Sequence, residues 1–116
     1  MIQRGDVYWA TLAPRSGSEQ AGRRPVVIVS NDGFNRIENW HSIIVVPLST
    51  SGRQARRGPT AVAIPASALG LAADGLALCH QITTLDRAKL QARVSLLPEA
   101  VMATIDEGIK AALALR

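Results

Sequence analysis

The sequence predicts a mainly-β domain, a small barrel of about six short strands with an amphipathic α-helix at its C-terminal end. Three observations support this fold class. Short β-branched or aromatic runs recur along the chain, segments bearing Gly and Pro separate them, and apolar residues at helical spacing follow Pro98. A length of 116 residues suits one core, so we expect a single domain spanning residues 1–116.

Six segments have the composition and length of strands: Asp6–Leu12, Arg24–Ser30, His41–Leu48, Thr60–Ile64, Leu76–Ile82 and Arg93–Leu96. Pro14, Gly17 and Gly22 predict a loop after the first strand. After the second strand, Asn31 can cap a single helical turn. Residues 51–59 form a second loop, and the stretch 65–75 is irregular. Closing these strands into a barrel would leave no open sheet edge.

The C-terminal segment has the features of a helix. Pro98 suits the first helical position, and Glu99 suits the positive end of the helix dipole. Asp106 and Lys110 are spaced to form an i,i+4 ion pair. One apolar face is formed by Val101, Ile105, Ile109, Ala112 and Leu113. We expect this face to pack on the barrel.

The charge balance favours an anionic partner. Lys and Arg number 13 against 9 acidic residues, and 11 of the 13 are Arg, the better side chain for bidentate phosphate contact. Cys79 is the single cysteine, so a disulfide framework is excluded. His41, His80 and Cys79 lack metal-ligand spacing, and we expect neither a metal nor another cofactor. No signal-peptide pattern or membrane-spanning run is evident, so we expect a cytoplasmic protein.

Strands two and three bring two basic loops together. If Ser30 lies opposite Ile43 in an antiparallel pair, Arg24 lies opposite Ser49, and a slip in register would place it opposite Thr50. Pro25 keeps Arg24 extended as the chain enters its strand. The loops 13–23 and 51–59 then hang from the same sheet edge. This convergence favours a phosphate-binding site, the alternative being a solvated cluster of charged loops.

Four motifs resemble one family. They are Arg4-Gly-Asp-Val-Tyr-Trp, the run from Gly17 to Asn31, Val46-Pro-Leu-Ser-Thr, and Leu78-Cys-His-Gln-Ile-Thr-Thr-Leu-Asp. In this order and spacing, they resemble the MazF/PemK toxins of bacterial toxin–antitoxin modules, over nearly the whole chain. The resemblance implies an SH3-like barrel with a C-terminal helix, a homodimer, and inhibition by a cognate antitoxin. It also implies a metal-independent, sequence-specific endoribonuclease that cuts single-stranded RNA and so inhibits translation and growth.

The resemblance assigns the catalytic pair, and the side chains of the two basic loops and of the last motif supply the other candidates. Arg24 and Ser49, with Thr50 beside it, correspond to the catalytic pair, and Glu19 is a candidate general base. The candidate RNA-binding residues are Ser18, Gln20, Arg23, Arg53, Arg56, Arg57, His80 and Asp86. Two departures matter. His80 replaces an acid and Thr83 replaces an arginine of the family pattern, so cut-site preference cannot be transferred.

The chemistry expected of such a site uses the nucleophile of RNA itself. The 2′-OH attacks the adjacent phosphorus and yields a 2′,3′-cyclic phosphate and a free 5′-OH. Arg24 would stabilise charge on phosphorus, and Ser49 or Thr50 would donate to a non-bridging oxygen. His80 is either a second candidate base or a structural residue. Trp40, Tyr8 and Phe34 are either stacking platforms or packing residues.

Two other functions are compatible with a small basic barrel. One is a toxin of the CcdB type, which poisons DNA gyrase without cutting nucleic acid, and the other is a plain RNA-binding module. The arginine–hydroxyl pair favours the nuclease. The partners expected of a nuclease toxin are single-stranded RNA, an acidic and partly disordered antitoxin, and a second copy of the chain.

Overall fold

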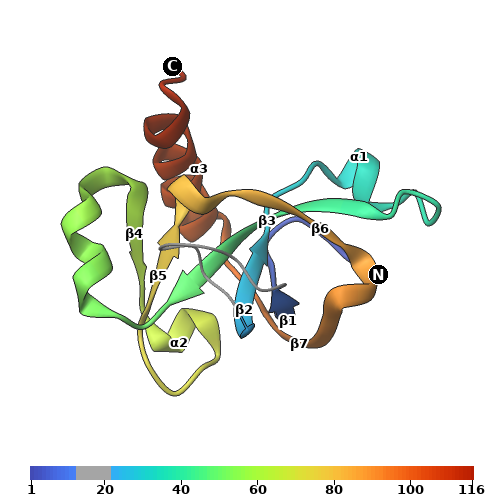
Figure 1. Cartoon of the computed structure of the whole chain (residues 1–116), viewed down its shortest axis with the longest axis horizontal. Helices are drawn as coiled ribbons and strands as arrows, with labels where there is room; N and C mark the ends of the chain where they lie inside the picture. Colours follow the sequence, from blue (N-terminus) through green and yellow to red (C-terminus); the bar gives the residue numbers. More distant parts are fainter. Residues whose placement is uncertain (13–21) are drawn as a thin grey trace.

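The computed structural model describes residues 1–12 and 22–116 and confirms a mainly-β fold with a C-terminal helix (Figure 1). The strands are β1 (Asp6–Leu12), β2 (Gly22–Ile28), β3 (Ser42–Ser49), β4 (Ala61–Ile64), β5 (Gly75–Leu78), β6 (Thr83–Asp86) and β7 (Leu90–Leu96). The helices are α1 (Asp32–Asn35), α2 (Ala66–Leu69) and α3 (Glu99–Leu113), and the 3-10 segments are η1 (Gly52–Thr60), η2 (Cys79–Gln81) and η3 (Arg87–Lys89).

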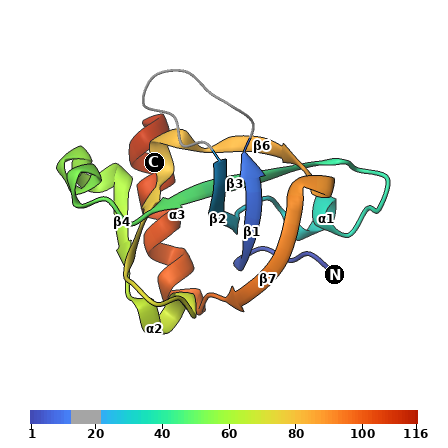
Figure 2. The same ribbon diagram turned by 60° about the horizontal axis from the view of Figure 1, so that its bottom comes forward.

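The described strands form one antiparallel sheet in the order β4-β5-β3-β2-β1-β7, and β6 also pairs with β3. Strand β3 is central, because β2 lies along one side of it while β5 and β6 share the other. Figure 2 shows β2, β1 and β7 side by side. Within the described part of the chain, the two outermost strands, β4 and β7, do not pair with each other. The sheet is therefore not closed, and the expected closure of a barrel is corrected.

The predicted register of strands two and three is confirmed. Val26 lies opposite Pro47, Val27 opposite Val46 and Ile28 opposite Val45. This is the register that places Arg24 opposite Ser49. It therefore brings the start of β2 and the end of β3 side by side. The capped turn is also confirmed, because the side chain of Asn31 accepts a hydrogen bond of 2.7 Å from the Gly33 N–H.

The fifth predicted strand is interrupted, which was not expected. Strand β5 ends at Leu78, the turn η2 follows, and β6 then resumes the pairing with β3. Between Val45 and Leu48, β3 advances three residues, whereas its partner uses six, from 77 to 83. The turn places Cys79 in the core, with its thiol 3.6 Å from the Ile105 carbonyl of α3. Alternation alone could not reveal this insertion.

Three further segments differ from their predictions. The basic segment 51–59 is mostly the 3-10 segment η1 instead of a loop, and the stretch 65–75 contains the short helix α2. Asp106 forms an ion pair with Arg4, while Lys110 pairs with Glu107 at 3.4 Å, so the predicted Asp106–Lys110 pair is wrong. Arg4 also donates to the Val29 carbonyl at 2.7 Å. This bond holds the guanidinium, and the Asp106 carboxylate that pairs with it, near the end of β2.

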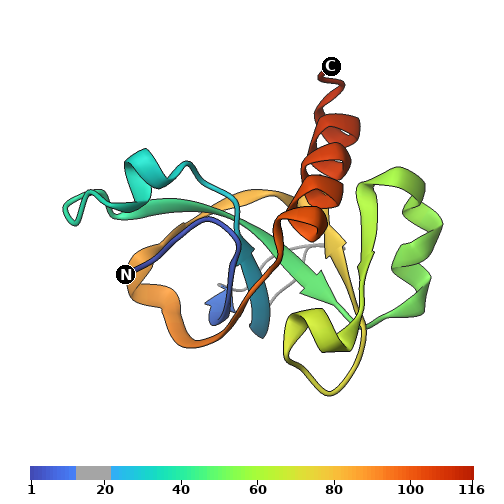
Figure 3. The same cartoon turned by 180° about the vertical axis from the view of Figure 1, so that it is seen from behind.

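Helix α3 packs against η1, η2 and β4, as seen from behind in Figure 3. Its buried residues are Met102, Ile105 and Gly108, and part of the predicted apolar face covers the same core cluster. Gly108 makes the close approach possible, because a Cβ there would lie 2.7 Å from Cys79 Sγ and from Val62 Cγ2. The described residues contain no helix with the length and apolarity needed to cross a membrane.

Candidate active site

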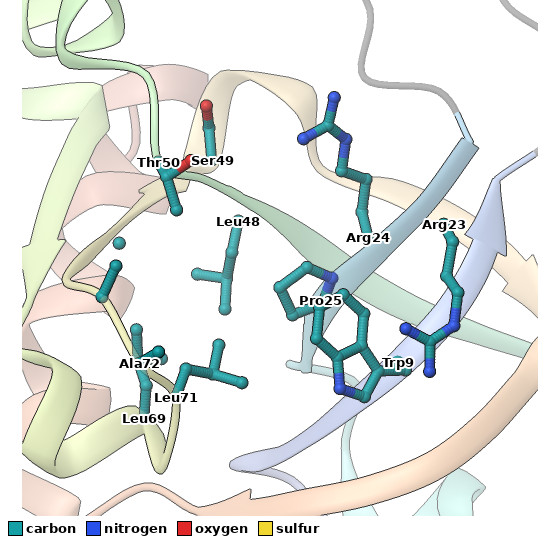
Figure 4. Close-up of a pocket in the computed structure, with 12 residues that line it drawn as sticks. Trp9, Arg23, Arg24, Pro25, Leu48, Ser49, Thr50, Leu69, Leu71 and Ala72 are labelled. Atoms are coloured by element: carbon teal, nitrogen blue, oxygen red, sulfur yellow. The ribbon is translucent and has the colours of Figure 1, made fainter.

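Arg24 and Ser49 lie at one end of a pocket of about 350 Å³, with Thr50 beside Ser49 (Figure 4). Arg24 is an exposed residue of β2, and Ser49 is the last residue of β3. The β2–β3 register brings both to the same sheet edge, and Pro25 keeps the chain extended there. The sequence-predicted pair is thus brought together at a single cavity.

The two hydroxyl residues have different environments. Ser49 is only 5% exposed, and its Oγ accepts a hydrogen bond of 3.1 Å from the Ser51 N–H. The hydroxyl hydrogen takes no part in that bond, so it can be donated to a ligand. Thr50 is exposed. The structure therefore distinguishes a held hydroxyl from a solvated one, which the sequence could not do.

The rest of the pocket is mostly apolar. Figure 4 shows Trp9 and Pro25 on one side, Leu71 and Ala72 on the other, and Leu48 between them. Trp9 lies directly opposite Pro25 across the β1–β2 pair. The remaining lining residues are Arg23, Leu69, Ala73 and Gly75. A charged and hydroxyl-bearing end thus adjoins a slot with apolar walls.

Arg23 holds Trp9 in this wall. Its guanidinium carbon lies 4.2 Å from the centroid of the Trp9 ring, a cation–π contact. Its Nε donates to Gln91 Oε1 at 2.8 Å, and Gln91 Nε2 in turn donates to Thr11 Oγ1 at 2.8 Å. Arg23 was expected to bind RNA. The structure places it at the pocket, where it also orients the aromatic wall.

Trp9 is the site residue that the sequence reasoning missed, although Tyr8, Phe34 and Trp40 were considered as stacking platforms. Phe34 and Trp40 stack on each other, with ring centroids 5.3 Å apart, and neither lines the pocket. Tyr8 is partly buried, and burial raises the pKa of its hydroxyl. The usable signal was register, since pairing strand one with strand two places Trp9 opposite Pro25.

The remaining cationic candidates lie on η1, the segment that follows Ser49 and Thr50 in the chain. Arg53, Arg56 and Arg57 are all exposed there. His80 lies on η2, and its pKa is lowered by burial and, to a smaller extent, by the charge of Arg57. Its Nδ1 is buried and has no hydrogen-bond partner among the described residues. Cys79 beside it is in the core, and burial raises the pKa of its thiol to about 11.

Not all predicted site residues converge. Asp86 lies opposite Ser42, at the other end of β3 from Ser49, and its carboxylate caps η3 by accepting from the Ala88 N–H at 2.8 Å. Glu19, Ser18 and Gln20 lie outside the described residues. Within residues 1–12 and 22–116, His, Cys, Asp and Glu form no group of three or more that could hold a metal ion.

Comparisons with known proteins place this geometry in a family. The family model described as "PemK-like, MazF-like toxin of type II toxin-antitoxin system" matches residues 3–113. The chain is 39% identical to the Endoribonuclease MazF of Staphylococcus epidermidis over 115 residues, which cover 99% of this chain and 93% of that protein. It is 37% identical to the Endoribonuclease EndoA of Bacillus subtilis, with 99% and 97% covered.

Solved structures agree in fold. An endoribonuclease in complex with its cognate antitoxin, from mycobacterial species, superposes with a TM-score of 0.80 at 28% identity, covering 100% of this chain and 98% of that one. MazF from Deinococcus radiodurans superposes with a TM-score of 0.78 at 23% identity, covering 98% and 97%, and this likeness concerns the fold alone. With the family model spanning almost the whole sequence, the chain belongs to the PemK-like, MazF-like toxins of type II toxin–antitoxin systems.

Proposed function

We propose that this chain is an endoribonuclease toxin that cleaves single-stranded RNA at the pocket end formed by Arg24 and Ser49. The observation that carries the proposal is the β2–β3 register, which brings a cation and a held hydroxyl to one cavity. The likeness of the chain over its full length to two endoribonucleases supports RNA cleavage as the reaction class. We place its action in the cytoplasm, where RNA under translation is found.

In the proposed reaction, the 2′-oxygen of a ribose attacks the adjacent phosphorus and the bond from phosphorus to the 5′-oxygen breaks. The products are a 2′,3′-cyclic phosphate and a 5′-OH. Water is therefore not a reactant, and no metal takes part in these bond changes. The proton of the 2′-OH leaves to a base, for which Glu19 is the candidate. The departing 5′-oxygen takes a proton from solvent, and the base returns its proton to solvent, so protons balance over one turnover.

The side chains act mainly on charge. The guanidinium of Arg24 serves as the cation that stabilises the pentacoordinate phosphorus. Ser49 donates its hydroxyl hydrogen to a non-bridging oxygen, while the Ser51 N–H holds its oxygen in place. Donors that are fixed before the reaction stabilise developing charge without reorganisation, which is commonly the largest catalytic contribution.

The proposal is tested by cleavage of a mixed-sequence single-stranded RNA in EDTA. We expect cleavage to proceed, with products ending in a cyclic phosphate and a 5′-OH. A 2′-deoxy nucleotide placed just 5′ of the scissile phosphate should block it. Cleavage of that deoxy substrate would show that water or a side chain is the nucleophile, and intact RNA in every condition would overturn the proposed activity.

Arg24→Ala identifies the site. Loss of one charge-stabilising donor should lower kcat by roughly 10²–10³-fold. The thermal melt is measured alongside, so that a loss of activity can be separated from a loss of folded protein. Arg24→Lys should recover little, since a point charge does not reproduce the bidentate guanidinium. Arg36→Ala, at another exposed arginine that does not line the pocket, is the control and should retain activity.

We further propose that a cognate antitoxin inhibits the chain and that the chain forms a symmetric dimer. The mycobacterial endoribonuclease with a TM-score of 0.80 was solved in complex with its cognate antitoxin. The exposed arginines of η1, the segment that follows Thr50 in the chain, supply positive charge that suits an acidic partner.

A further inference from the structure

We propose that the stacked rings of Phe34 and Trp40 hold unpaired bases of RNA outside the cut site, as a second contact with the strand that enters the pocket. This inference rests on the proposed endoribonuclease activity. The two ring centroids lie 5.3 Å apart, with 24° between the ring planes. Both rings belong to residues 34–41, which we call the tip. Figure 1 shows the tip running from α1 into β3, at the opposite end of the long axis from η1 and β4.

The tip keeps large apolar side chains in contact with solvent. Phe34 is 49% exposed, Trp40 48% and Ile37 46%. The Ile37 N–H donates to the Phe34 carbonyl and the Trp40 N–H to the Ile37 carbonyl, each at 3.0 Å, which holds the three residues together. Single exposed apolar residues are common on protein surfaces, whereas several that gather in one place mark an interaction site. The cluster at the tip therefore indicates a ligand.

Hydrogen bonds fix the tip before any ligand arrives. Asn35 is buried, and its Nδ2 donates to the Ser30 carbonyl at 2.8 Å. The guanidinium of Arg87 donates at 2.5–3.1 Å to the carbonyls of four tip residues, Phe34, Asn35, Ile37 and Trp40. A platform that is already ordered spends little conformational entropy on binding.

Stacked aromatic rings with free surface suit a flat, unsaturated ligand. Each ring gives one face to its partner and stays about half exposed, so ring surface remains for a third flat group. Unpaired bases of single-stranded RNA are such groups, because every base has a π face and stacks on aromatic side chains with little regard to sequence. The tip would therefore strengthen the binding of RNA without choosing the cut site.

The charges near the tip favour RNA over an acidic protein segment. Arg36 and Glu38 are exposed within the tip, and Asp86 and Lys89 are exposed on either side of Arg87. These four charges balance, so an acidic segment would gain little attraction there. RNA does not need that attraction, since the same strand is held at the pocket and its flank is present at a high effective concentration.

The tip is a separate contact that a longer RNA can reach. Neither Phe34 nor Trp40 lines the pocket at Arg24. Strand β3 begins at Ser42, directly after the tip, and ends at Ser49. At the rise of a β-strand, roughly 23 Å separate these two residues. An RNA that extends several nucleotides beyond its cut site can therefore contact both ends of β3.

The test compares three RNA oligonucleotides that contain the same single cut site. The short RNA ends close to that site. The long RNA carries unstructured extensions of about 16 nucleotides on both sides, the upper size of a single-strand site on a small β-barrel domain. The abasic RNA has extensions of equal length that keep the phosphates and lack the bases.

The proteins are the native chain, Phe34→Leu, Trp40→Leu and Trp40→Phe, the last being the matched control that retains a ring. Each variant is first checked for an unchanged thermal melt, and a leucine variant that fails this check is replaced by the other. The comparison of the long RNA with the abasic RNA on the native chain needs no variant.

We expect the native chain to cleave the long RNA with a kcat/KM roughly 5- to 150-fold above that for the short RNA, the factor for stacking one base. The gain should appear in KM, with kcat unchanged, because the tip does not touch the reacting phosphate. The abasic RNA should show little of this gain. Phe34→Leu and Trp40→Leu should lose most of it and still cleave the short RNA like the native chain, whereas Trp40→Phe should keep most of it.

Four outcomes would overturn the inference. Equal kcat/KM for the long and the abasic RNA would show that no base outside the cut site is held. A gain that survives in both leucine variants would place the contact elsewhere on the chain. Leucine variants that keep the gain but bind the antitoxin more weakly would assign the tip to a protein. These three results would leave the proposed function standing, whereas a native chain that cleaves none of the three RNAs would overturn the proposed function as well.

Discussion

At the residue scale, the two neighbouring hydroxyls of the site are not equivalent. Ser49 is buried and its oxygen is held by the Ser51 N–H, whereas Thr50 is exposed. We expect Ser49→Ala to lower kcat by about 10²-fold, since a fixed donor to the reacting phosphate is lost. Thr50→Ala should cost less than about tenfold, the loss expected for a donor that water can replace. Single-turnover RNA cleavage measures both, and equal losses would show that the two hydroxyls substitute for one another.

His80 makes stability depend on pH. Burial and Arg57 disfavour its charged form, so its pKa in the folded chain lies below the ordinary 6.5. Above that value neither state binds the proton, and stability is unaffected. As the pH falls below about 6.5, the unfolded chain takes up a proton that the folded chain does not, so stability decreases. We expect urea unfolding midpoints at pH 7.5 and pH 5 to differ more for the native chain than for His80→Gln, and equal differences would assign the effect to another group.

Residue identity carried part of the site but not all of it. Arg24 and Ser49 followed from register and from the resemblance, because both depend on the order of residues along the chain. Trp9 was missed because strands one and two were not aligned with each other from the sequence, and that register is what places Trp9 opposite Pro25 in the pocket wall. Asp86 matches the family pattern, yet in this structure it caps η3 at the far end of β3.

At the element scale, the contact of α3 with the sheet depends on one glycine. A helical Gly→Ala change alone favours the helix by about 1 kcal/mol. At Gly108, however, the new Cβ would lie 2.7 Å from Cys79 Sγ and from Val62 Cγ2, and 3.4 Å from the Pro59 carbonyl. We expect the clash to dominate and Gly108→Ala to destabilise the chain by roughly 1–3 kcal/mol in urea unfolding.

Two further variants check the origin of that loss. Ala103→Gly, at an exposed position of the same helix, should cost about 1 kcal/mol from propensity alone. Adding Cys79→Ala to Gly108→Ala should recover part of the stability lost through the clash, since it removes one of the two closest atoms. A Gly108→Ala chain that is more stable than the native one would show that α3 shifts at no cost.

The elements themselves were predictable where local signals agree. Strand β1, the Asn31 cap and helix α3 combine propensity, pattern and termini, and all three formed where expected. Strand β6 was missed because the run Leu76–Ile82 reads as one strand, and the turn at η2 is imposed by packing Cys79 under α3. That the sheet stays open was not predictable either, since closure depends on whether the two edge strands meet.

At the scale of the whole molecule, a dimer needs an apolar surface that a single chain leaves exposed. The apolar run of β3 is largely buried within this chain. On the predicted apolar face of α3, Ile105 is buried, and Val101, Ile109 and Ala112 are partly buried against the same core. Large apolar residues that remain exposed include Leu96, Leu113 and Leu115. A C2 contact would cover such residues, so we expect light scattering at micromolar concentration to give twice the 12.3 kDa of one chain. A single-chain mass would contradict this.

The charge of the molecule predicts how the antitoxin binds. The formal net charge is +4, and three of the cations are the exposed Arg53, Arg56 and Arg57 on η1, the segment that follows Ser49 and Thr50 in the chain. An acidic segment that folds across this surface gains part of its attraction from charge, which salt screens. We therefore expect the Kd of the antitoxin to rise with NaCl concentration, and the slope of log Kd against log [NaCl] to be smaller when these three arginines are changed to serine.

The matched control changes Arg36, Lys89 and Arg116, three exposed cations outside η1, and should keep most of the native slope. Equal slopes for the two triple variants would show that binding depends on net charge alone, and a salt-independent Kd would show that the antitoxin is held by apolar contacts.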